Sequence, residues 1–312
     1  MIIVTNDEGA AGVEAAAASL REGKAALDAV QAGIEPVEAD PAIRSVGRGG
    51  LPTMLGIVEC DAAIMDGATR MTGAVGALRG YLHAIAAARL VMERLPHVML
   101  AGEGAARFAG EMGLEAAEML TGEARAAHAS WVRKRGLDDL VNGVAHAPLT
   151  SLAWPMPTSR TGGTVIYLAM DRHGHLSAGA STSGWAYKYP GRLGDSPLIG
   201  AGIYADDRCG ACGCTHTGEM TIRCGTARSV VLLMKGGARV AEACHEAAAD
   251  LGDLRGGFLG PVVIHAIDRH GEPYALAVNA PASIDFWLWT HDLEQPQRQS
   301  CAQARATQGD ES

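Results

Sequence analysis

The sequence predicts a mixed fold of α-helices and β-strands. Short apolar runs rich in β-branched residues, too short for helices, fall into two clusters along the 312-residue chain. Longer alanine-rich segments with apolar residues at helical spacing lie between these runs. This order is compatible with stacked sheets covered by helices on both sides, but periodicity alone does not separate it from an ordinary α/β fold.

The N-terminal half begins with a short apolar strand and continues with an alanine-rich helical segment that Gly23 interrupts. Pro36 and Pro41 are expected to end this helical segment. Residues 127–163 lose the periodicity and contain several prolines, so they are expected to form a flexible connector. The predicted strands are 2–5, 55–66 around a turn, 72–76 and 98–101, and the predicted helices are 9–34, 83–94 and 102–113.

The C-terminal half opens with two apolar runs separated by the turn at 171–174, which predicts a hairpin. From Asp292 onward the chain is polar, so a disordered tail is expected. The predicted strands are 164–170, 176–182, 260–267 and 274–278, and the predicted helices are 227–235 and 238–251.

The composition excludes several classes of protein. With 48% hydrophobic residues the chain can bury a large core, as one large or two ordinary domains. A net charge of −9 leaves no basic stripe to offset phosphate, so no nucleic-acid partner is expected. Residues 1–9 lack the basic and apolar regions of a signal peptide, and no apolar run could span a bilayer. We therefore expect a cytoplasmic protein without membrane contact.

Seven cysteines, an odd number, fit a reducing compartment better than a disulfide framework. Cys209, Cys212 and Cys214 form a cluster in the sequence CGACGC, but a second pair at zinc-ligand spacing is missing. We therefore expect free thiols, buried or half-buried, with no metal and no cofactor.

The chemistry is concentrated between Gly162 and Gly225. Thr164 follows two glycines at the start of a predicted strand, and the hairpin turn would bring Thr182 to its side. Arg192 and Asp195 lie three apart in a loop rich in glycine and proline. Taken singly, such residues are usually a solvated ion pair or ordinary turn hydroxyls, so the combination matters more than any one of them.

In this combination the chain resembles the N-terminal-nucleophile hydrolases of the plant-type (type 2) asparaginase, isoaspartyl peptidase and glycosylasparaginase family. The resemblance extends from about Thr5 to Asn279, with several spaced motifs in one order. In the C-terminal half these are GTV at 163–165, STSG at 181–184, PGRLGDSPLIGAG at 190–202 and TxTGE at 215–219. In the N-terminal half they are GKAALDAV at 23–30, SVGRGG at 45–50, ARLVME at 88–93 and PHVMLAGEGA at 96–105.

The resemblance implies an α+β fold, a four-layer αββα sandwich, and a precursor that cuts itself between Gly163 and Thr164. The products would be an α subunit of residues 1–163, ending in the flexible connector, and a β subunit of residues 164–312. Two cleaved protomers would form a dimer.

The resemblance also implies the role of each site residue. Thr164 would attack the side-chain amide of an asparagine-like substrate, with its own freed α-amino group as the base. Thr182 would orient the nucleophile, and the Thr215 hydroxyl with the backbone N–H of His216 would stabilise the oxyanion. Arg192 would hold the substrate α-carboxylate and Asp195 its α-ammonium group. Gly218 and Ser45 are expected to contact the substrate as well.

The chain departs from the family pattern at three places. Asn6 and Glu8 stand where glycosylasparaginases have a Trp and a Phe that line the substrate pocket. Their polar side chains either turn outward or favour a cationic leaving group. His216 replaces a glycine, and a positive φ there would cost free energy. Gly162 and Gly163 replace the His-Asp that the glycosylasparaginase branch has before the nucleophile, but the asparaginase branch also has Gly there, so self-cleavage is still expected.

Three functions remain open from the sequence. The first is hydrolysis of β-aspartyl amides, which include asparagine, isoaspartyl dipeptides and N4-glycosylated asparagine. The second is hydrolysis of another class of amide by the same nucleophile. The third is a binding scaffold without catalysis, for which neither processing nor dependence on Arg192 is expected.

Overall fold

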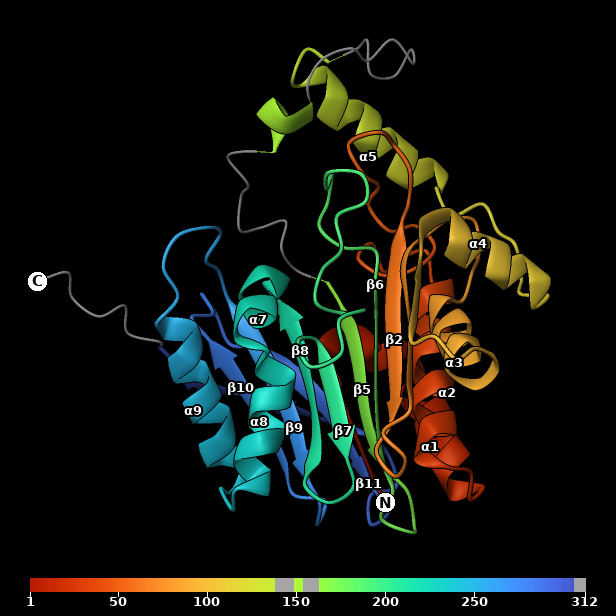
Figure 1. Ribbon diagram of the computed structural model, residues 1–312. Helices are drawn as coiled ribbons and strands as arrows, with labels where there is room; N and C mark the ends of the chain where they lie inside the picture. Colours follow the sequence, from red (N-terminus) through yellow and green to blue (C-terminus); the bar gives the residue numbers. More distant parts are fainter. Residues whose placement is uncertain (138–148, 154–162, 306–312) are drawn as a thin grey trace, which may run out of the picture.

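The computed structural model describes residues 1–137, 149–153 and 163–305, and it contains two β-sheets with helices packed on them (Figure 1). The predicted α+β class is confirmed. The larger sheet has eight strands in the order β12-β11-β1-β5-β6-β2-β3-β4. Their bounds are β12 Gln297–Ser300, β11 Asp285–Thr290, β1 Ile2–Asn6, β5 Val165–Met170, β6 Leu176–Thr182, β2 Cys60–Asp66, β3 Thr72–Leu78 and β4 Met99–Ala101.

The smaller sheet has five strands in the order β13-β10-β9-β8-β7. Their bounds are β13 Ala302–Ala304, β10 Pro273–Val278, β9 Val262–Asp268, β8 Gly210–His216 and β7 Ile203–Asp206. One buried apolar cluster joins side chains of both sheets, so the sheets pack face to face. The other two large clusters lie between each sheet and its helices.

Helices cover the outer face of each sheet (Figure 1). On the larger sheet these are α1 Val13–Arg21, α2 Ala26–Ala39, α3 Ala84–Arg94 and α4 Gly102–Glu111. On the smaller sheet they are α7 Gly218–Cys224, α8 Thr226–Lys235 and α9 Val240–Gly252. The remaining helical segments in the described part of the chain are α5 Gly122–Arg133 and the 3₁₀ turns η1 Asp7–Gly12 and η2 Leu149–Leu152. Among the described residues, no helix is long and apolar enough to cross a membrane.

Strand β5 lies in the middle of this arrangement because both of its faces are apolar. Val165 and Tyr167 pack on the helix side, whereas Ile166 and Leu168 pack between the sheets. A strand buried on both faces reads as a continuous apolar run rather than an alternating one. The β-branched and aromatic side chains of VIYLAM meet this requirement.

Two element boundaries lie about five residues from the predicted ones. Helix α2 continues past Pro36 to Ala39, and the Asp40 N–H still donates to the Pro36 carbonyl at 3.1 Å. The proline removes only its own N–H, and the burial of Val37 and Glu38 supports the last turn. The strand predicted from residue 55 begins only at Cys60, because the preceding residues form a turn closed by the Thr53 N–H and the Ile57 carbonyl.

The polar segment after Asp292 is not a disordered tail up to residue 305. Strand β12 pairs with β11 and strand β13 pairs with β10, so the segment adds an edge strand to each sheet. Edge pairing needs only backbone groups, which a polar sequence supplies as well as an apolar one. The expected connector at 127–163 is helical in α5 through Arg133, where Trp131 and Val132 are buried, and residues 138–148 and 154–162 lie outside the described part.

A close contact at Gly12 predicts a stability effect. A Cβ at Gly12 would lie 1.8 Å from the carbonyl oxygen of Gly33, where η1 meets α2. We expect Gly12→Ala to lower the free energy of unfolding by about 1–3 kcal/mol, because the backbones would have to separate. In the control, Gly104→Ala, a Cβ would meet open space in α4. This change should be neutral or stabilise by up to about 1 kcal/mol. Urea unfolding of both variants measures the difference, and equal effects would contradict the contact argument.

Candidate active site

Thr164 stands immediately before β5 and is 7% exposed. The preceding Gly163 has a φ of +110°, and a Cβ there would lie 1.8 Å from the Cβ of Ser45. Only glycine fits this combination of backbone angle and space. The backbone conformation before the predicted nucleophile therefore depends on Gly163.

The predicted hairpin is present, and it brings the two threonines together. Strands β5 and β6 pair with Val165 opposite Ser181, so Thr164 and Thr182 are the next residues on each strand. The Thr182 hydroxyl donates to the Gly163 carbonyl oxygen at 2.8 Å and accepts from the Gly184 N–H at 2.9 Å. The donated bond polarises the Gly163 carbonyl, whose carbon forms the peptide bond to Thr164 that is expected to be cut.

Strand β8 ends at Thr215 and His216. The Thr215 hydroxyl is buried and lies 3.0 Å from Nδ1 of His216. His216 has a φ of +81°, the left-handed region in which a non-glycine residue is strained. Burial lowers the pKa of His216, which favours the neutral ring. A neutral ring can donate to or accept from the Thr215 hydroxyl.

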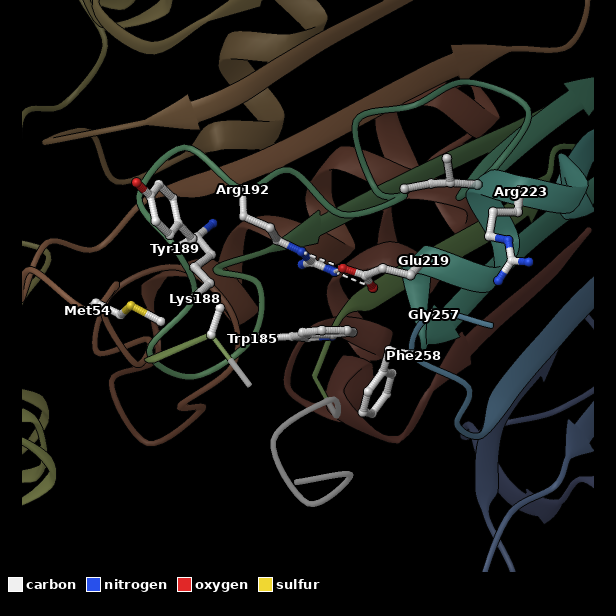
Figure 2. A pocket seen from close by; sticks show the side chains of 11 residues that line it. Met54, Trp185, Lys188, Tyr189, Arg192, Glu219, Arg223, Gly257 and Phe258 are labelled. Atoms are coloured by element: carbon white, nitrogen blue, oxygen red, sulfur yellow. Dashed lines mark hydrogen bonds and ion pairs between the residues drawn. The ribbon is translucent and has the colours of Figure 1, made fainter. Parts of the chain in front are cut away.

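Arg192 lies in the loop after β6 and faces a pocket of about 480 Å³ (Figure 2). Its guanidinium carbon lies 4.3 Å from the centre of the Trp185 ring, whose edge-to-face partner is Phe258. Three hydrogen bonds of 2.7 to 3.0 Å join Arg192 to the carboxylate of Glu219 on α7. Arg192 therefore binds a carboxylate of the protein itself. The family resemblance implies that the same guanidinium group binds the α-carboxylate of the substrate.

Asp195 is buried close to the start of α7. Its carboxylate accepts from the Thr221 hydroxyl at 2.7 Å. Burial raises the pKa of Asp195 to about 6, and the nearby Arg192 opposes that rise. A Cβ at Gly218 would lie 2.7 Å from Oδ1 of Asp195, so Gly218 allows the helix to approach the carboxylate.

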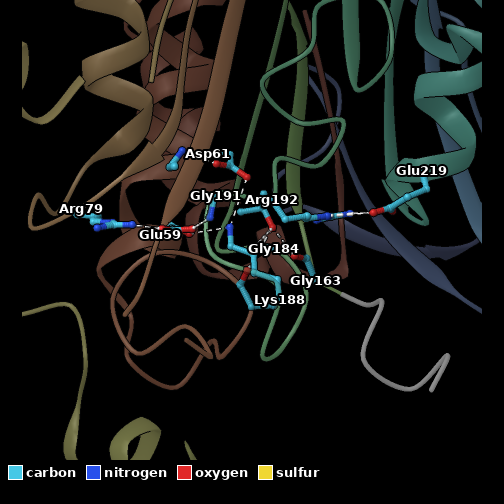
Figure 3. Close-up of polar contacts among 12 residues, drawn as sticks. Glu59, Asp61, Arg79, Gly163, Gly184, Lys188, Gly191, Arg192 and Glu219 are labelled. Atoms are coloured by element: carbon cyan, nitrogen blue, oxygen red, sulfur yellow. Dashed lines mark hydrogen bonds and ion pairs between the residues drawn. The ribbon is translucent and has the colours of Figure 1, made fainter. Parts of the chain in front are cut away.

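A buried network fixes the loop that carries Arg192 (Figure 3). The Lys188 ammonium group is 1% exposed, donates to the Glu59 carbonyl at 3.3 Å and lies 3.7 Å from the Asp61 carboxylate. The buried Glu59 carboxylate accepts from the Gly191 N–H at 2.9 Å and from Arg79. These contacts tie both ends of the segment from 188 to 191 to strand β2 and the residue preceding it.

Residues 6–291 match the family described as Asparaginase. The chain belongs to this family. It is 37% identical over 264 residues to an N(4)-(beta-N-acetylglucosaminyl)-L-asparaginase of Elizabethkingia miricola, covering 81% of this chain and 71% of the relative. It is 36% identical over 281 residues to an isoaspartyl peptidase of Salmonella typhimurium, covering 90% of this chain and 86% of the relative. The isoaspartyl peptidase of Escherichia coli is 37% identical over 283 residues, covering 90% and 84%.

Membership of the asparaginase family makes the chain an amidohydrolase. The expectation of a binding scaffold without catalysis is therefore set aside. Two features of this asparaginase-family site were missed from the sequence. Glu219 is part of the TxTGE motif, but its pairing with Arg192 joins residues 27 positions apart, which the motif does not predict. Lys188 lies between two tyrosines in the sequence, and this context does not predict a buried lysine. In the structure its burial beside Asp61 lets it fix the loop that carries Arg192.

All seven cysteines of this amidohydrolase are free thiols, and six of them are buried. Cys212 and Cys214 pack with Cys244 of α9 in the cluster beneath the helices of the smaller sheet. In the described ranges, no group of three or more His, Cys, Asp or Glu side chains is placed to hold a metal ion.

Proposed function

We propose that the protein is a self-cleaving threonine amidohydrolase that acts on β-aspartyl amide bonds. One observation carries the proposal. The hydroxyl of Thr182 donates to the carbonyl of Gly163, and the next residue is the buried Thr164. A polarised carbonyl beside a threonine hydroxyl is the arrangement that an intramolecular attack requires.

In the proposed self-cleavage, the Thr164 hydroxyl oxygen attacks the Gly163 carbonyl carbon. The bond to the Thr164 nitrogen breaks, the nitrogen takes up the proton, and an ester forms. Water then hydrolyses the ester and leaves Gly163 as a carboxylate and Thr164 as an amino terminus. The φ of +110° at Gly163 is a conformation that cleavage would release. The products are residues 1–163 and 164–312, and the mature enzyme is a dimer of cleaved protomers.

In the proposed turnover, the free amine of Thr164 removes the proton from its own hydroxyl, which attacks the substrate amide. The amine leaving group departs with a proton, and water hydrolyses the resulting β-aspartyl ester. Arg192 binds the substrate α-carboxylate, either in place of the Glu219 carboxylate or together with it. Asp195 binds the α-ammonium group of the substrate. The Thr215 hydroxyl and the N–H of His216 stabilise the oxyanion, and Ser45 and Gly218 shape the site.

Intact mass spectrometry followed by a substrate panel tests the proposal. We expect fragments of residues 1–163 and 164–312 in the purified protein, because Thr164 needs a free amine to act. The cut protein should hydrolyse at least one of asparagine, a β-aspartyl dipeptide and N4-(β-N-acetylglucosaminyl)-L-asparagine, for which the names of the relatives provide the precedent. An uncut protein that hydrolyses any of them would contradict the proposal.

A second candidate is a different class of amide with the same nucleophile. It is favoured by the polar residues Asn6 and Glu8 and by the side chain at His216, which change the surroundings of Thr164 and Thr215. The same panel separates the candidates. A correctly cut protein that hydrolyses none of the three substrates would favour the second.

A further inference from the structure

The end of strand β1 makes an unusual contact with the residue proposed as the nucleophile. Backbone pairing between β1 and β5 stops at Thr5 opposite Tyr167, although Asn6 still pairs with β11 through Phe286. Beyond that point the side chain of Asn6 forms hydrogen bonds to the main chain of residues 164 and 166. Its Oδ1 accepts from the Ile166 N–H at 3.0 Å, and its Nδ2 donates to the Thr164 carbonyl at 2.5 Å. The Asn6 amide therefore bonds two main-chain groups, the Ile166 N–H and the Thr164 carbonyl, just beyond the point where backbone pairing with β1 stops.

A carboxylate fixes the orientation of this amide. The second hydrogen on Nδ2 of Asn6 goes to Oε2 of Glu8 at 2.5 Å. The Thr164 carbonyl and the Glu8 carboxylate can only accept, and the Ile166 N–H can only donate. Only one orientation of the amide satisfies all three partners. Asn6 is 3% exposed, so these contacts are shielded from water.

We propose that Asn6 is a positioning residue, whose amide holds the Thr164 main chain once the bond to Gly163 has been cut, with Glu8 keeping the amide in register. The inference rests on the proposed function. Before cleavage, covalent bonds on both sides hold Thr164. After cleavage Thr164 is a chain end, and chain ends fray unless something ties them down. The hydrogen bond from Asn6 to its carbonyl is then the contact that opposes this fraying from the side of β1.

The sharpest test is Asn6→Asp, which keeps the size of the side chain and the acceptor for Ile166 but removes the donor to Thr164. We expect the chain to be cut as fast as the parent, because Gly163 still holds Thr164 at that stage. In the cut protein we expect kcat to fall about 100-fold, with KM little changed, because a displaced nucleophile costs rate rather than binding. Cutting is followed by intact mass, so loss of cutting and loss of turnover are scored separately.

The pH profile provides a readout that a purely structural role would not give. In Asn6→Asp, the new carboxyl group and Glu8 face each other and share a proton as the pH falls. Burial already raises the pKa of Glu8, and the charge of Asp7, which Arg298 pairs, adds to the rise. When that proton resides on the new carboxyl group, its O–H can donate to the Thr164 carbonyl, so the kcat of the variant relative to the parent should rise from about pH 8 to about pH 5.

Two further variants complete the test. Gln31→Glu is the matched control, because Gln31 also donates to a carboxylate, that of Glu35 on α2, but does not touch Thr164. It should leave kcat unchanged. Glu8→Gln keeps a neutral acceptor for Asn6 and removes the charge, so it should lower kcat by only a few-fold with no recovery at low pH.

The outcomes separate the two proposals. Normal kcat in cut Asn6→Asp, or a loss of cutting as large as the loss of turnover, would overturn the role of Asn6. Either result leaves Thr164 as the nucleophile if Thr164→Ala is uncut and inactive. A cut and active Thr164→Ala would instead refute the proposed function itself. If Asn6→Asp does not fold, Glu8→Gln decides, and unchanged kcat in that variant overturns the inference.

Discussion

Thr164→Ala should leave the protein as one uncut chain of 312 residues and abolish its amidase activity. The side-chain oxygen is the proposed attacking atom in both self-cleavage and turnover, so its removal affects both steps. Loss of a nucleophile that acts with its base as a unit costs at least about 10⁴-fold in kcat. Intact mass and a continuous ammonia or amine assay measure the two effects on the same sample.

Thr164→Ser is the matched control because it keeps the hydroxyl and the α-amino group. It should be cut and should hydrolyse substrate, more slowly than the parent, because the loss of the methyl group loosens a side chain that is now 7% exposed. The assignment of Thr164 as the nucleophile would be wrong if Thr164→Ala were cut normally, or if the uncut variant retained the activity of the parent.

Asp195→Asn should lower kcat/KM strongly while preserving the fold. The amide keeps an acceptor for the Thr221 hydroxyl but cannot neutralise the α-ammonium group of a substrate. Removal of one partner from a buried charge pair costs about 2–5 kcal/mol, roughly 30-fold to 4,000-fold in kcat/KM. Asp206→Asn is the control, because Asp206 is also buried and pairs with Arg208 outside the site. Similar losses in the two variants would show that burial, and not substrate charge, determines the effect.

The same residue gives the parent enzyme a pH dependence of known sign. Burial raises the pKa of Asp195 to about 6, so the carboxylate is ionised above that pH and protonated below it. The neutral form does not attract an ammonium group. We expect kcat/KM to fall as the pH drops through about 6, because this parameter reports groups of the free enzyme. This fall in kcat/KM at low pH should be absent in Asp195→Asn. If the fall persists in that variant, another group is responsible for it.

Much of the architecture could be predicted from local patterns. The apolar run VIYLAM after Thr164 predicts a strand, and the turn after it predicts the hairpin that the structure confirms. The polar segment after Asp292 misled the prediction, because strands β12 and β13 draw their stability from backbone pairing at sheet edges. Pro36 was similarly misleading, since tertiary packing of α2 outweighed one lost hydrogen bond.

The sequence by itself determined the family and supplied the candidate residues of the site. The order of the motifs around Thr164, Thr182, Arg192 and Asp195 is written in the chain, and it requires no coordinates. Only the tertiary structure decided how these residues are engaged. It pairs Arg192 with Glu219, gives His216 a φ of +81° and joins Asn6 to the Thr164 carbonyl across 158 positions of sequence. Such contacts depend on how β1, β5 and α7 meet, and no local pattern encodes distances between segments so far apart.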